Sequence, residues 1–107
     1  MDHRLELHEV LCGIINLTEP DGDRHVYFDP PASVRMKYPA IVYSRGGIDN
    51  LHADNSVYNQ FYPYEVIVID HTPDSEYVDK VSKLPRCKWN RHYKADNLNH
   101  DVFTLFN

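Results

Sequence analysis

The sequence has no long hydrophobic run, few cysteines and no excess of basic residues. No apolar stretch approaches the ~20 residues that a helix needs to cross a bilayer. The N-terminal part, residues 1–20, also lacks the apolar segment of a signal peptide. We therefore expect neither membrane association nor a secretion signal.

The shortage of cysteine and of positive charge narrows the possible functions further. Cys12 and Cys87 are the two cysteines, and they show no CxxC spacing. We interpret them as buried thiols of a cytosolic chain that needs no disulfide or metal to fold. The formal net charge of −5 argues against general nucleic-acid binding, because that function relies on a cationic surface.

The composition that remains is typical of a small globular protein. The 107 residues suit a single domain, 1–107, and the 42% apolar and 25% charged residues suit a soluble fold. Tyrosine is the commonest aromatic residue, with eight copies against four Phe and one Trp. Because tyrosine combines apolar area with a hydrogen-bonding hydroxyl, it suits both strands and protein interfaces. The composition is a mild indication of a contact surface.

Hydrophobic periodicity predicts the order of the elements. Leu7, Val10, Leu11 and Ile14 recur at helical spacing, and residues 66–69 are apolar on both faces, as in a central strand. The predicted elements are a helix at 2–16, strands at 25–28, 38–44 and 64–70, a helix at 72–84, and strands at 87–94 and 102–106. The prediction is an α+β fold of order α-β-β-β-α-β-β. Its two helices pack on one face of an antiparallel or mixed sheet of four to five strands.

Local signals predict two boundaries between these elements. Pro20, Asp21 and Gly22 form a turn sequence between the first helix and the first strand. Thr72 is followed by proline and acidic residues, which predicts that it is the N-cap of the second helix, and Pro85 ends that helix.

A long polar connection separates the second and third predicted strands. Residues 45–56 contain Gly46, Gly47 and two Asp-Asn pairs, and a small domain seldom keeps so long a loop without a use. The glycine pair lacks the Lys-Ser/Thr of a phosphate-binding loop, so we interpret it as a source of flexibility. We predict that this loop is an assembly arm. The candidate interface residues here and in the aromatic stretch that follows are Arg45, Ile48, Asp49, Asn50, His52, Asp54, Asn55, Tyr58, Phe61 and Tyr62.

The strand at 87–94 carries the strongest local charge pattern. Arg86, Lys88, Asn90, His92 and Lys94 fall at every second position, so period-2 alternation predicts that all of them share one face. A charged edge strand that blocks aggregation, contact with an acidic partner protein and contact with DNA are the three interpretations. From this strand, Arg86, Lys88, His92 and Lys94 join the candidate interface residues.

The sequence contains no recognisable catalytic set. The seven histidines show no metal-ligand spacing, and we interpret them as ordinary surface or interface residues. Asp49 and Asp54 do not have the spacing of a calcium loop. Neither cysteine has the partly exposed, electropositive setting predicted for a reactive thiolate. We expect no enzyme activity, cofactor or metal; a small metal-dependent hydrolase that uses some of the histidines is the enzymatic alternative.

Segments spread over residues 4–107 carry a resemblance to a known family. They are Val26 to Phe28 with Pro30 and Pro31, Tyr38 to Tyr43, Tyr64 to Asp70, Leu84 to Cys87, and Asp96 to Phe103. Together they resemble the tail terminators of long-tailed bacteriophages, which are small tail-completion (head-tail joining) proteins. The resembling motifs are structural, and the family has no catalytic residues to carry over. The order of helices and strands predicted above is similar to that family's fold.

The resemblance implies a structural virion protein. Such a protein forms a ring, typically a hexamer, that caps the head-proximal end of the tail tube and joins it to the neck. Its partners are other copies of itself, the tail tube protein and a neck or head-completion protein, and DNA passes through the ring only as cargo. The expected location is the tail or neck of the virion, after assembly in the host cytoplasm. A head-tail connector adaptor or stopper of the neck is the alternative within this class.

Overall fold

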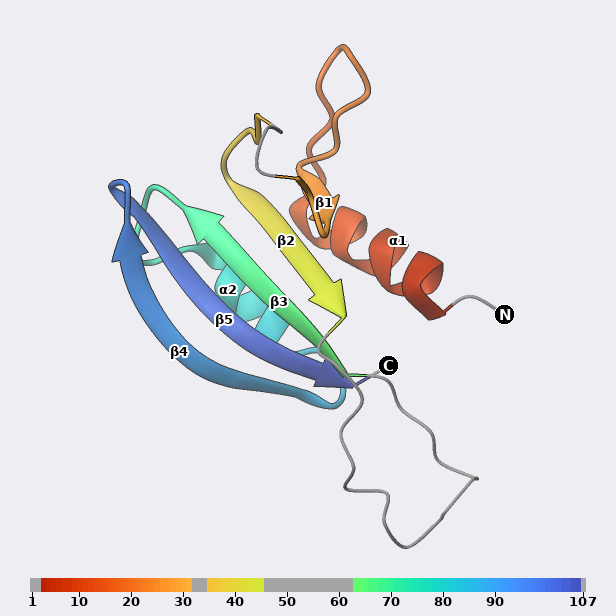
Figure 1. The fold of residues 1–107 in the computed structure, drawn as a ribbon, viewed down its shortest axis with the longest axis vertical. Helices are drawn as coiled ribbons and strands as arrows, with labels where there is room; N and C mark the ends of the chain where they lie inside the picture. The colour runs from red at the N-terminus through yellow and green to blue at the C-terminus, as the bar shows by residue number, and fades with distance from the viewer. Residues whose placement is uncertain (1–2, 32–34, 46–62, 107) are drawn as a thin grey trace, which may run out of the picture.

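The structure is a computed structural model that describes residues 3–31, 35–45 and 63–106. These residues form two helices and five strands in the predicted order (Figure 1). Their bounds are α1 His3–Ile15, β1 Val26–Phe28, β2 Ala40–Arg45, β3 Pro63–Asp70, α2 Glu76–Ser82, β4 Cys87–Ala95 and β5 Leu98–Phe106. The predicted α+β class is confirmed.

The strands form one mixed sheet in the order β1-β2-β3-β5-β4. β1 runs parallel to β2, and every other neighbouring pair is antiparallel (Figure 1). The apolar β3 lies at the centre, as predicted, and β1 and β4 are the two edges. A two-residue turn joins β4 to β5, and both of its residues, Asp96 and Asn97, have positive φ, at 53° and 62°. That conformation is typical of a tight hairpin turn and is one that Asp and Asn tolerate.

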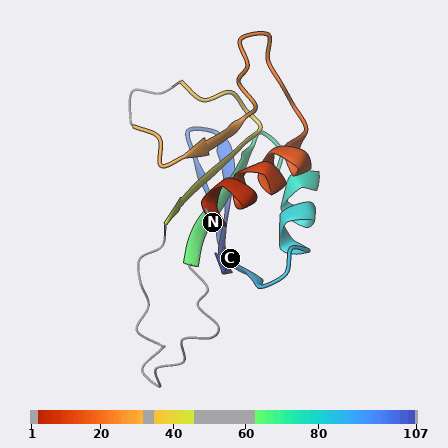
Figure 2. The ribbon, with the colours of Figure 1, turned by 90° about the vertical axis from the view of Figure 1, so that its right-hand side faces the viewer.

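Both helices cover the same face of the sheet (Figure 2). Leu7 and Leu11 of α1 and Val81 of α2 are buried against strand residues such as Val66 and Phe103, which are 0% exposed. The helical periodicity is correct, but the buried stripe lies one position away from the predicted one. The helix buries Leu7, Leu11, Cys12 and Ile15, whereas Val10 is 45% exposed.

α2 begins three residues later than the sequence predicts. Ser75, not Thr72, is the N-cap, and its hydroxyl accepts a hydrogen bond from the backbone N–H of Tyr77 at 3.2 Å. The Thr72 hydroxyl instead accepts the N–H of Asp74 at 3.2 Å, which makes a local turn before the helix. Thr72 and Ser75 have the same capping chemistry, and Ser75 is the one that folding buries, at 8% exposed.

Candidate functional site

The edge strand β4 is the most exposed regular element in the described part of the chain. Every residue from 88 to 94 is exposed, and no acidic residue occurs between Cys87 and Ala95. Lys88, Arg91 and Lys94 make this edge cationic in a chain of net charge −5. One side of an edge strand's backbone has no neighbour to pair with, and charged side chains are a common way to protect it.

β4 contains a bulge that the alternation of its sequence does not reveal. Trp89 pairs with Phe103 of β5, whereas Arg91 pairs with Val102, the residue directly before Phe103. Asn90 is therefore an extra residue without a partner in the pairing register. Since side chains alternate along a strand, one extra residue reverses the faces of all positions that follow it.

The prediction that the basic residues share one face is wrong for this reason. Lys88 and Arg91 lie on the face of the sheet that carries no helix, whereas His92 and Lys94 lie on the helix-covered side. If β4 alternated regularly through Asn90, without the bulge, His92 and Lys94 would lie on the same face as Lys88, and Arg91 would lie on the other face. The cationic edge consequently presents charge to both sides of the sheet, not to one.

Arg86, also a candidate interface residue, forms part of the fold. It lies just before β4 with a φ of 59°. Its Nε donates a 3.1 Å hydrogen bond to the carbonyl oxygen of Phe106, and the Phe106 N–H donates to the Arg86 carbonyl at 3.1 Å. These bonds hold the end of β5 against the start of β4.

Trp89 is an exposed aromatic residue in a fixed position on the helix-covered side. Its side chain is 52% exposed, and its indole Nε1 donates a 3.2 Å hydrogen bond to Oδ1 of Asp101, which is buried. Beside it, His92 Nε2 lies 3.2 Å from Asn99 Oδ1, and the Asn99 amide donates to the His71 carbonyl at 3.3 Å. A tryptophan held by a buried partner with its ring exposed is typical of an interface anchor.

A second aromatic group lies on the other face of the same hairpin. The Tyr93 and His100 rings are stacked, with centroids 4.6 Å apart and planes 11° apart. The Arg91 guanidinium lies 5.8 Å from the centroid of the Tyr93 ring. Tyr93 is 38% exposed. The hairpin thus carries an ordered aromatic and a cation on this face also.

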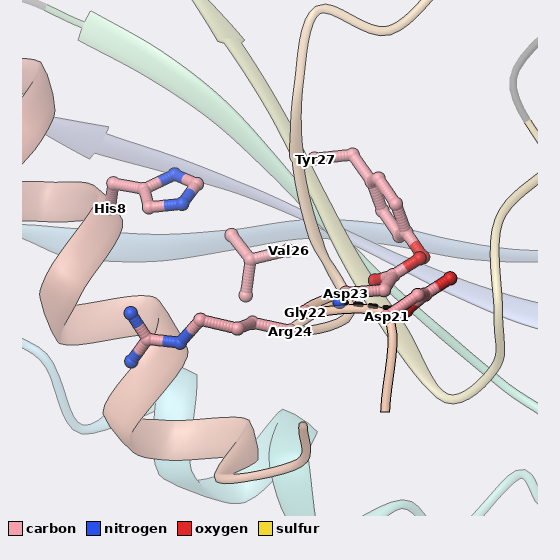
Figure 3. Close-up of a pocket in the computed structure, with 7 residues that line it drawn as sticks. All are labelled: His8, Asp21, Gly22, Asp23, Arg24, Val26 and Tyr27. Atoms are coloured by element: carbon pink, nitrogen blue, oxygen red, sulfur yellow. Dashed lines mark hydrogen bonds between the residues drawn. The ribbon is translucent and has the colours of Figure 1, made fainter. Parts of the chain in front are cut away.

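The opposite edge of the sheet, beside β1, contains an open hollow of about 410 Å³ (Figure 3). Its lining residues are His8, Asp21, Gly22, Asp23, Arg24, Val26 and Tyr27. In Figure 3, His8 of α1 lies on one side of Val26, and Tyr27 lies on the other side with Asp21 and Asp23. The predicted turn at 20–22 is present: the Gly22 N–H donates to the Glu19 carbonyl at 2.9 Å, and Gly22 has a φ of 92°.

Hydrogen bonds hold the carboxylates of this hollow in place. The Tyr27 hydroxyl lies 2.9 Å from both carboxylate oxygens of Asp23, and Lys37 Nζ lies 3.2 Å from Oδ2 of Asp21. Burial, with the Asp23 carboxylate beside it, raises the pKa of Tyr27 to about 12. The Tyr27 hydroxyl therefore stays protonated at neutral pH and donates a hydrogen bond to Asp23.

His25 is buried, although the sequence predicts a surface or interface histidine. It is 4% exposed, not on the surface, and its two ring nitrogens face two acceptors. Nδ1 lies 2.8 Å from the Pro39 carbonyl oxygen, and Nε2 lies 2.7 Å from Oε2 of Glu19. Both nitrogens must donate to satisfy both acceptors, which only the protonated imidazolium does. Burial opposes that charge, but the bonds to Glu19 and to Pro39, with the nearby carboxylates, outweigh it and raise the pKa of His25.

The remaining candidate groups for chemistry are separate from one another. Within the described residues, no group of three or more His, Cys, Asp or Glu side chains is placed to hold a metal ion. Cys12 is buried, as predicted, and Cys87 is half-buried; burial raises the pKa of both thiols. His8, also predicted on the surface, is half-buried and hydrogen-bonded to the Tyr43 hydroxyl at 2.7 Å.

The predicted assembly arm lies mostly outside the described residues. Arg45 is described: it is exposed at the end of β2 and pairs in register with Tyr64 of β3. Arg45 and Tyr64 therefore lie at the same end of the sheet. The other candidate residues of the arm and of the aromatic stretch that follows it lie outside the described residues, and these are Ile48, Asp49, Asn50, His52, Asp54, Asn55, Tyr58, Phe61 and Tyr62.

No family model, no curated protein and no solved structure matches this chain. Among the described residues, no helix has the length and apolar character to cross a membrane.

Proposed function

We propose that this chain is a structural subunit of a bacteriophage tail, a tail terminator. Copies of it form a ring that caps the head-proximal end of the tail tube and joins the tube to the neck. Its partners are then other copies of itself, the tail tube protein and a neck protein, and DNA passes through the ring as cargo. The resemblance of the sequence to this family is the starting point of the proposal.

The observation that carries the proposal is the difference between the two edges of the sheet. β4 is a long, exposed, cationic edge with an ordered tryptophan, and β1 is a short edge beside a hollow that contains fixed carboxylates. A ring needs two different patches on each subunit, because each copy contacts one neighbour through each patch. Two unlike edges at opposite ends of one sheet meet that requirement.

Tube polymerisation in the presence of this chain tests the proposed function. Purified tail tube protein is assembled with and without the chain, and tube lengths are measured by electron microscopy. A terminator shortens the tubes and appears as a ring at one tube end.

A parallel pull-down against tube and portal proteins separates the two neck functions. Binding to tube protein supports a terminator. Binding to the portal protein alone contradicts a terminator and supports a neck adaptor or stopper. A chain that binds neither protein and leaves tube length unchanged contradicts both functions.

A further inference from the structure

We propose that neighbouring copies of this chain join edge to edge, with β4 of one copy adding to β1 of the next. This inference rests on the proposed ring function and specifies the contact between subunits. The contact between β4 and β1 makes one continuous sheet around the ring by β-strand addition, in which main-chain hydrogen bonds supply part of the affinity. The partner is a second copy of this chain.

The strand directions allow this contact without turning the sheet over. β1 and β2 run in the same direction, β3 runs against β2, β5 runs against β3, and β4 runs against β5 (Figure 1). β4 therefore runs opposite to β1. Copies related by rotation about a ring axis keep the same face of the sheet on the same side. β4 of one copy therefore meets β1 of the next in antiparallel orientation, and antiparallel strands can form a hydrogen-bonded pair.

Both edges have backbone groups directed outward. The carbonyl of His25 and the N–H of Asp29 bond to β2, at 2.9 Å and 2.8 Å. Along a parallel pair, alternate residues face the neighbouring strand, so the N–H and C=O groups of Val26 and Phe28 point to the free edge. Among the described residues, β4 is the other edge and likewise has one side of its ladder unpaired.

The charges of the two edges match on the face that carries no helix. Lys88 and Arg91 lie on this face of β4. On β1 the same face carries Tyr27, whose hydroxyl holds the Asp23 carboxylate, with Asp21 in the same hollow. Adding β4 to β1 places the two cations beside the Asp23 carboxylate and beside that of Asp21, which Lys37 of the same copy also contacts at 3.2 Å. Such complementarity selects the correct partner and speeds association.

The helix-covered side supplies a shape match. Trp89 projects on this side of β4 and is 52% exposed. On the same side of β1, His8 and Val26 line the hollow of about 410 Å³ (Figure 3). The added strand therefore brings the indole to the hollow of the next copy. The hydrogen bond to Asp101 already orients the ring, which lowers the entropic cost of binding.

A second copy explains these features better than an unrelated acidic partner does. Each chain carries one edge of each kind, so a closed ring pairs every edge and leaves no hollow and no cationic strand exposed. An acidic peptide on β4 accounts for the cations but not for the hollow at the opposite edge. Two features at the two ends of the sheet thus have a single explanation.

Two single-edge variants test the contact, measured by native mass spectrometry with and without tube protein. Trp89→Ala weakens the β4 edge, and Asp21→Lys places a cation against Lys88 and Arg91 at the β1 edge. Loss of an anchor tryptophan is expected to weaken each contact by about 30-fold or more. Each variant alone is expected to form few or no rings. Mixed in equal amounts they are expected to form dimers and nothing larger, because only one of the two possible contacts between them retains both Trp89 and Asp21.

Matched controls change similar residues away from both edges. Val10→Ala removes an apolar side chain that is 45% exposed and, two residues from His8, lies on the opposite side of α1, and Asp74→Lys reverses an exposed charge near the start of α2. Both controls are expected to assemble as the wild type does, and circular dichroism verifies that every variant is folded. Rings that form equally well in wild type and in both edge variants overturn the edge contact and leave the ring function standing. A folded wild type that stays monomeric with tube protein present overturns the contact and the function together.

Discussion

Replacing His25 with glutamine is expected to destabilise the protein most below neutral pH. The protonated ring donates to the Pro39 carbonyl and to Glu19, at 2.8 Å and 2.7 Å. Glutamine has no positive charge and can reach only one of these acceptors. A hydrogen bond to a charged group is worth about 1.5–3 kcal/mol and a neutral one about 1 kcal/mol. Since the Glu19 side chain is 35% exposed and partly hydrated in the variant, we expect a net loss of about 2–3 kcal/mol.

The loss depends on pH in a defined direction. The pKa of His25 is raised in the folded state above the 6.5 of an unperturbed histidine. Its stabilising contribution is therefore complete below pH 6.5 and is lost as pH rises through the higher folded pKa. Burial lowers the pKa of His8, which acts in the opposite sense, but His8 is present in both wild type and variant. The difference between the two proteins isolates His25.

Urea unfolding of wild type and His25→Gln at a series of pH values between about 5.5 and 8.5 measures this difference. The difference in free energy of unfolding should be largest at the acid end and shrink toward the alkaline end. His71→Gln, the same change at an exposed histidine, is the control for the removal of an imidazole. A His25→Gln difference that is constant with pH, or that grows as pH rises, would refute the imidazolium assignment.

Two further changes test the packing and the helix boundary. Ser75→Ala should lower the free energy of unfolding by about 1 kcal/mol and Thr72→Ala by less, because only Ser75 caps α2; equal losses in urea unfolding contradict that assignment. Phe103→Ala should cost about 3–5 kcal/mol, because the ring is 0% exposed at the centre of the core, and a change below 1 kcal/mol in the same assay is inconsistent with this position.

Local patterns predict the elements of this fold well. The apolar residues of β3 identify the central strand because a strand buried on both faces has few polar positions. Pro20, Asp21 and Gly22 mark a turn because proline presets one dihedral angle and glycine permits the positive φ that follows. The α-β-β-β-α-β-β order follows from such signals, each of which depends on a few neighbouring residues.

The site depends on contacts that no local pattern contains. The bulge at Asn90 leaves the alternation of residue types in the sequence intact but reverses the faces of the residues that follow it. The alternation therefore predicts a single basic face that the folded strand does not have. The charge on His25 depends on Pro39, fourteen residues away, which comes close only when β1 and β2 pair. The sequence predicts Thr72 as the N-cap of α2, but Ser75, a residue of similar chemistry three positions later, caps the helix.

The mass of the assembled wild-type protein tests the central claim most directly. Native mass spectrometry is run on the chain alone and on the chain mixed with tail tube protein. We expect one closed oligomer of a single stoichiometry in at least one of these samples, because unlike edges that pair head to tail stop adding copies only when the ring closes. A chain that is monomeric in both samples would contradict the proposed ring.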